Sequence, residues 1–111
     1  MNMREPSEPL GDINVATADG VAMTVTDVPE AVRFESRAAG ELVGYITYRH
    51  SGKATFLVHV VTESQWQGRG VATAMTTAVL GLIRRAGRSV VPRCPFVADF
   101  LARHPEMQDL V

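Results

Sequence analysis

The sequence predicts a single α+β domain in which an antiparallel strand meander is followed by a helix, a strand and a second helix. Three observations support this fold class. Polar and apolar residues alternate with a period of two before residue 63, as in half-buried strands. Apolar residues then recur at helical spacing after Gly70, and a short β-branched run and a proline-headed segment follow. A chain of 111 residues has the length of one domain.

The first part of the chain shows no sustained period. Pro6, Pro9, Gly11 and Gly20 interrupt it, so we expect a flexible N-terminal arm over residues 1–24 and a folded domain over residues 25–111. A short extended segment around residues 21–26 is compatible with this sequence.

Three strands are predicted next, over residues 31–38, 41–50 and 54–62. Glycine-containing turns, Ala39-Gly40 and Ser51-Gly52, separate them and predict a meander. In the third strand apolar residues occupy both alternating positions, which predicts that both of its faces are covered.

The period then changes to that of a helix. One apolar face comprises Val71, Ala72, Met75, Ala78, Val79, Leu82, Ile83 and Ala86. Gly87 is a helix stop, Ser89-Val90-Val91 is a short strand ending at Pro92, and Pro95 suits the first position of a second helix reaching towards His104.

Composition excludes several classes of protein. There is one cysteine, Cys94, so neither a disulfide framework nor a cysteine-rich zinc site is expected, and His50 and His104 lack metal-ligand spacing. No apolar run suits a membrane helix and the start does not resemble a signal peptide, so a reduced, cytoplasmic protein is expected. A net charge of −1 gives no support for nucleic-acid binding. The basic C-terminal half suits a small anionic ligand or, alternatively, a solvated arginine surface.

The segment between the third strand and the long helix, Gln65-Trp66-Gln67-Gly68-Arg69-Gly70, contains the strongest functional signal. Two glycines allow several amides to point at one place, which is also the positive end of the helix dipole. Such a loop suits a diphosphate, although a plain turn is the alternative. No Lys-Ser/Thr pair follows, and the three-glycine dinucleotide pattern is absent.

Gln-x-x-Gly-x-Gly resembles the pyrophosphate loop of the GNAT superfamily of acetyl-CoA-dependent N-acetyltransferases. The chain from about residue 27 to residue 111 is similar to the short, single-domain YjdJ-type branch. The segments that carry this likeness are Arg33-Phe34-Glu35, Gly44-Tyr45-Ile46-Thr47-Tyr48, Pro92-Arg93-Cys94-Pro95-Phe96-Val97 and the ending from His104 to Val111. The family's usual His-Thr-Glu-Val is replaced here by His59-Val60-Val61-Thr62, which removes a carboxylate from this strand.

The resemblance implies a minimal GNAT fold whose sheet splays at a cofactor cleft, with residues 25–111 forming an acetyl-CoA-binding domain. Acetyl-CoA would lie between the third strand and the strand at residues 89–91. The residues implied in binding it are Val61 and Thr62 for the pantetheine arm, Gln65, Gln67, Gly68, Arg69, Gly70 and Val71 for the pyrophosphate, and Cys94 and Phe96 near the thioester.

The implied catalytic residues are Cys94 and His59. Cys94 would be a nucleophile or a group that contacts the acetyl moiety, and a buried structural cysteine is the alternative. His59 would accept a proton from the amine or have a structural role. The implied activity is acetyl transfer from acetyl-CoA to a primary amine of a small molecule or a protein lysine, by a monomer that binds no metal. The alternatives are a CoA-binding module without turnover and a regulatory domain for another nucleotide.

Overall fold

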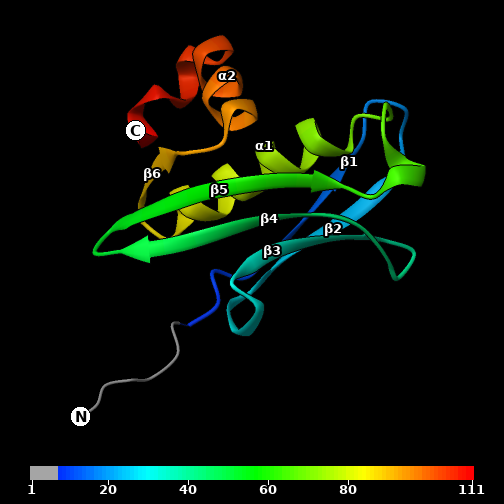
Figure 1. The fold of residues 1–111 in the computed structure, drawn as a ribbon, viewed down its shortest axis with the longest axis horizontal. Helices are drawn as coiled ribbons and strands as arrows, with labels where there is room; N and C mark the ends of the chain where they lie inside the picture. Colours follow the sequence, from blue (N-terminus) through cyan, green and yellow to red (C-terminus); the bar gives the residue numbers. More distant parts are fainter. Residues whose placement is uncertain (1–7) are drawn as a thin grey trace.

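The computed structural model describes residues 8–111, which form six strands, two α-helices and three short 3-10 helices (Figure 1). The strands are β1 (Asp12–Ala16), β2 (Ala22–Val28), β3 (Arg33–Ala38), β4 (Glu41–Ser51), β5 (Ala54–Thr62) and β6 (Ser89–Pro92). The helices are α1 (Val71–Arg85) and α2 (Pro95–Arg103), and the 3-10 helices are Pro29–Ala31, Ser64–Trp66 and Pro105–Leu110. The α+β class and the order of elements from β3 onward are as predicted.

The strands form one sheet in sequence order, from β1 to β6. Neighbours from β1 to β5 are antiparallel, and β6 is parallel to β5 because α1 connects them.

The expected flexible arm over residues 1–24 is wrong from residue 12 onward, where β1 pairs with β2 along its whole length. Ile13 and Val15 pack against the core from β1. Their two-residue alternation extends over only five residues, which is too short a signal to stand out in the sequence. Residues 1–7 of the expected arm lie outside the described residues.

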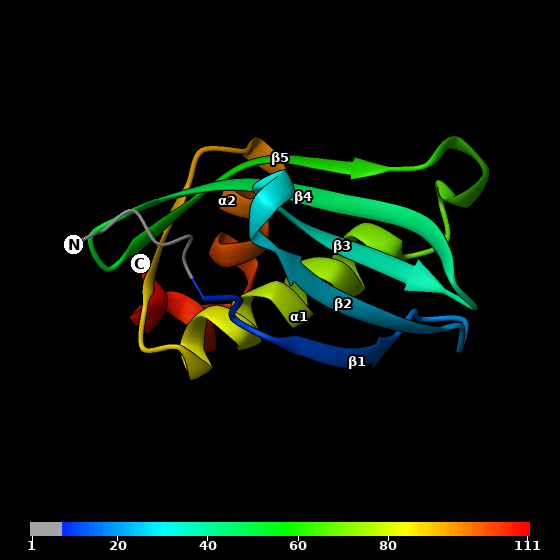
Figure 2. The same ribbon diagram turned by 90° about the horizontal axis from the view of Figure 1, so that it is seen from below.

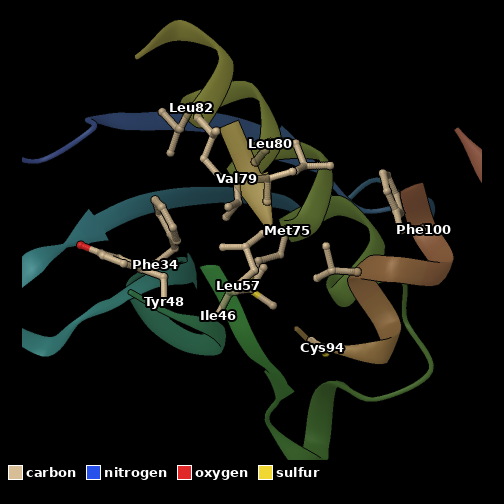
Figure 3. Close-up of a cluster of buried hydrophobic side chains, with 14 of the residues drawn as sticks. Phe34, Ile46, Tyr48, Leu57, Met75, Val79, Leu80, Leu82, Cys94 and Phe100 are labelled. Carbon is tan, nitrogen blue, oxygen red and sulfur yellow. The ribbon is translucent and has the colours of Figure 1, made fainter. Parts of the chain in front are cut away.

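Both helices lie on the same side of the curved sheet (Figure 2), and one main core fills the space between (Figure 3). Phe34, Ile46 and Leu57 face this core from the sheet, Leu80 and Ile83 face it from α1, and α2 contributes three residues, Val97, Phe100 and Leu101. Most of the apolar face predicted for α1 is buried, whereas Ala72 is partly buried and Ala86, after the end of the helix, is exposed. None of the helices formed by residues 8–111 has the length and apolar character needed to cross a membrane.

The opposite, outer face of the sheet has no helix over it within residues 8–111. Cross-strand pairs such as Arg49–Phe56 and Thr47–His59 lie on this face, and both Arg49 and His59 are exposed. The prediction that the strand at residues 54–62 is covered on both sides is thus wrong. Its apolar residues on the outer face, including Phe56 and Val58, are only partly buried.

A buried carboxylate ties the beginning of the described chain to the middle of the sheet. Asp27 accepts hydrogen bonds from the Tyr48 hydroxyl at 2.7 Å and from the Leu10 amide at 2.8 Å. Only 3% of Asp27 is exposed. A buried polar group is costly when it lacks a partner, so this network fixes the position of the segment before β1.

We expect Asp27→Ala to lower the free energy of unfolding by about 2 kcal/mol, because the buried Tyr48 hydroxyl and the Leu10 amide lose their acceptor. Urea denaturation measures this loss. In Tyr48→Phe/Asp27→Ala the combined loss should be smaller than the sum of the single losses, because the two residues share one interaction. A loss below about 0.5 kcal/mol for Asp27→Ala would contradict the assignment.

Stability should also depend on alkaline pH through Tyr48. Burial raises the pKa of its hydroxyl above the usual 10, and the hydrogen bond to Asp27 raises that pKa further. This contribution to stability is complete below pH 10 and is lost as the pH rises beyond it, since the unfolded state then releases the proton more readily. From about pH 9 to about pH 11, the wild type should lose more stability than Tyr48→Phe, and equal losses would contradict this role.

Candidate functional site

The sheet opens between β5 and β6. The two strands pair only from Ala54–Ser89 to Leu57–Pro92. Beyond this point the amides of Arg93 and Cys94 both donate to the Leu57 carbonyl, at 3.0 and 3.1 Å, and the chain turns into α2 (Figure 1). Within the described chain, residues 59–62 of β5 therefore pair with β4 alone. The splayed sheet that the resemblance implied is present.

Hydrogen bonding to β4 determines which β5 amides face this opening. The Glu63 amide donates to the Val43 carbonyl, and the His59 amide donates to Thr47 Oγ1, so both point to β4. Amides alternate between the two edges of a strand, so those of Val60 and Thr62 point to the open edge. The Thr62 carbonyl accepts a hydrogen bond from Gln67 Nε2 at 3.4 Å, so a side chain of the following loop lies beside this part of β5.

Val61 does not fit the expected contact with a pantetheine arm. It pairs with Tyr45 on β4, and its carbonyl oxygen lies 2.8 Å from the position that a Cβ would take at Gly44. Its backbone therefore points away from the opening, and the neighbouring Val60 amide points towards it. The sequence pattern missed Val60 because edge orientation depends on the pairing register with β4.

The loop after β5 bends at two glycines. Gly68 has φ +76° and Gly70 has φ +84°, in the region that favours glycine. Gly70 is the N-cap of α1, and it provides no side-chain cap for the helix. The Ala74 amide makes the first helical bond, to the Gly70 carbonyl, which leaves the amides of residues 71–73 without helical acceptors.

These amides lie at the positive end of a 15-residue helix whose first turn has no acidic residue. Gln65, Gln67, Gly68 and Arg69 are exposed around this end, whereas the Val71 side chain is buried. The arrangement suits an anion such as a diphosphate, held by backbone amides.

The β1–β2 turn packs beside this loop, a neighbour that the sequence pattern did not predict. A Cβ at Gly70 would lie 3.5 Å from the Ala18 amide nitrogen. Arg69 stacks over the Trp66 ring at 4.3 Å, and its Nε lies 3.8 Å from Asp19 Oδ2. A hydrogen bond from Thr17 lowers the pKa of Asp19, and the charge of Arg69 adds to this effect. Arg69 thus lies near the loop, but it has a protein carboxylate beside it.

Cys94 lies where β5 and β6 part. It is the N-cap of α2 and is 8% exposed, at the border of the core (Figure 3). Its backbone amide donates to Leu57, so the residue is held at the inner end of the opening. Phe96, the second residue of α2, is 38% exposed and lines a depression of about 200 Å³ with Thr73 of α1 and Phe100. This depression lies between the start of α1 and α2.

His59 and Cys94, the two implied catalytic residues, belong to opposite faces of the sheet. Cys94 is part of the core on the helix side. His59 lies on the exposed outer face, paired with Thr47, and lines a hollow of about 450 Å³ with Val58 and Arg49. The two side chains therefore lie on opposite sides of the sheet, near the point where β5 and β6 part.

An extended ligand could thus pair with a strand edge while its anionic part binds amides at a helix end. Known proteins agree with this class of site. The sequence model of the family described as GCN5-related N-acetyl-transferase matches residues 33–110. This chain therefore belongs to the GCN5-related N-acetyltransferase family.

The solution structure of a GCN5-like, provisionally assigned N-acetyltransferase from Staphylococcus aureus is similar in fold. It is 21% identical in sequence, the match covers 71% of this chain and 79% of that one, and the TM-score is 0.57. No curated protein matches the sequence significantly.

We expect Gly70→Ala to weaken CoA binding about tenfold or more, since alanine is strained at φ +84° and the loop must move. Titration calorimetry with CoA measures the change. Gly52→Ala is the matched control. Gly52 likewise has a positive φ, but it lies in the β4–β5 turn, where a Cβ would meet open space. Equal affinity of Gly70→Ala and wild type, with both folded, would contradict the loop assignment.

Proposed function

We propose that this protein transfers the acetyl group of acetyl-CoA to a primary amine. The observation that carries the proposal is the open edge of β5, which leads directly to the uncapped amides of α1. The Val60 and Thr62 backbones would pair with the pantetheine arm, and the amides from Gly68 to Thr73 would bind the pyrophosphate. Membership of the family supports this use of the site.

The acetyl-CoA-binding domain proposed here includes β1 and β2. Their turn packs on the pyrophosphate loop through Ala18, next to Gly70. Without this hairpin the loop would lose its contact with Ala18. The functional domain would therefore begin with β1, before residue 33, where the family match begins.

In the proposed reaction, a neutral amine attacks the thioester carbonyl directly. A nitrogen–carbon bond forms, the carbon–sulfur bond breaks, and CoA leaves as a thiolate that takes up one proton. The attacking nitrogen loses one proton, and His59 on the outer face is the proposed acceptor. The opening holds the reactants in place, and this orientation supplies much of the rate.

Cys94 is proposed to contact the acetyl group rather than to attack it. A nucleophilic cysteine needs a base that takes its proton or a positive environment that favours its thiolate. The start of α2 offers Cys94 such an environment, so the proposal depends on the base. Within residues 8–111 no hydrogen bond joins the Cys94 thiol to a histidine. His59, two residues after the point where β5 and β6 part, lies on the outer face of the sheet, opposite to Cys94.

We expect Cys94→Ala to lower kcat by about tenfold or less, whereas loss of a nucleophile commonly costs a thousandfold or more. Release of the CoA thiol from acetyl-CoA, measured with a panel of amines, provides the rate. Intact-mass measurement after incubation with acetyl-CoA alone should show no acetylated protein. An acetyl adduct that disappears in Cys94→Ala would overturn direct transfer.

A CoA-binding module without turnover is the second candidate. It is favoured by Val60 and Val61, which occupy positions where the family has Thr and Glu, so this part of β5 carries no carboxylate. The thiol-release assay separates the candidates. CoA binding without release above background for any amine would support the module and contradict the enzyme.

A further inference from the structure

Within residues 8–111, two arginines on the outer face of the sheet, Arg49 and Arg93, make no ion pair. Seven other arginines in the described range, residues 8–111, make side-chain hydrogen bonds or ion pairs: Arg33, Arg37, Arg69, Arg84, Arg85, Arg88 and Arg103. For Arg49 and Arg93, by contrast, no side-chain hydrogen bond or ion pair is formed with any residue of that range. Both side chains are exposed.

These two arginines line the same hollow, although one comes from β4 and the other from the segment after β6. The hollow has a volume of about 380 Å³, and its floor is formed by Phe56 and Val58. Arg93 lies over the Phe56 ring, 5.2 Å from its centre, and Arg49 is the cross-strand neighbour of Phe56. None of the residues that line the hollow is acidic.

The hollow continues to the proposed reaction centre. It shares Arg49 and Val58 with the second hollow, which contains His59. Phe56 precedes Leu57, where β5 and β6 part, and Val58 follows it. Two residues of a strand span about 7 Å. A single small molecule could therefore extend from an anion site above Phe56 to the opening.

We propose that the acetyl acceptor is a small amine that also carries an anionic group, bound by Arg49 and Arg93, and an apolar body that rests on Phe56 and Val58. This inference rests on the acetyltransferase function proposed above. Guanidinium groups bind carboxylates and phosphates through charge-assisted hydrogen bonds. The same two charges repel a second ammonium group, so polyamines and cationic lysine peptides are poor acceptors.

The test compares phenylalanine with phenethylamine, which differ by one carboxylate. We expect phenylalanine to give a kcat/KM for CoA release at least tenfold higher, mainly through a lower KM. Arg49→Gln and Arg93→Gln should each lower kcat/KM for phenylalanine more than kcat/KM for phenethylamine, and so remove most of this preference. Arg37→Gln is the control, because Arg37 lies on the same face but is paired with Glu35 on β3. A preference for phenethylamine or spermidine would overturn the proposal while leaving the transferase function intact.

A second arm uses phosphoethanolamine, to separate phosphate from carboxylate as the preferred anion. A third measures binding without turnover, by following backbone amide signals of the CoA-bound protein as phenylalanine is added. Shifts at Val58 and His59 that Arg49→Gln abolishes support the anion site, even if no amine releases CoA and the transferase function fails. Shifts that persist in both Arg49→Gln and Arg93→Gln, or no shifts at all, would refute it.

Discussion

The candidate site depends on how the pairing between β5 and β6 ends. The Leu57 carbonyl oxygen accepts hydrogen bonds from two amides, those of Arg93 and Cys94, and the pairing of the two strands ends there. Pro92 has no amide with which to extend the ladder, and Pro95 opens α2 in a new direction. The rest of β5 is left with one unpaired edge. Such an edge is normally covered, because exposed amides and carbonyls attract another strand; here it leads to the start of a helix.

This opening joins two different environments. On the helix side it borders the apolar core, with Cys94 at its inner end. On the other side it borders an exposed sheet face that carries arginine, histidine and partly buried apolar residues. No helix in residues 8–111 covers this outer face, so the proposed acceptor would approach β5 there, and the proposed thioester would lie on the core side. The two faces of the sheet differ because both helices pack on the same one.

Much of the fold was predictable because its signals are local. The alternation in β3 to β5, the helical period of α1 and the positions of Pro92 and Pro95 each depend on a few neighbouring residues. The bent loop was also predictable, since Gly68 and Gly70 do adopt positive φ. β1 was missed because two apolar residues, Ile13 and Val15, are too short a pattern to predict a strand. The strand is stabilised by pairing with β2 and by packing on the core. Coverage of β5 was misjudged because apolar residues on both faces do not reveal which face a helix will cover.

The sequence by itself determined the order of elements from β3 onward, the glycine bend before α1 and the place of Cys94 at the start of α2, since these follow from the preferences of adjacent residues. Only the tertiary structure decided that Val60 rather than Val61 faces the opening, because a bulge at Val58 and the register with β4 set the direction of each amide. It alone brought Arg93 over the ring of Phe56, the cross-strand neighbour of Arg49. Residues so far apart in the chain meet only when a sheet has formed, and no local preference encodes that meeting.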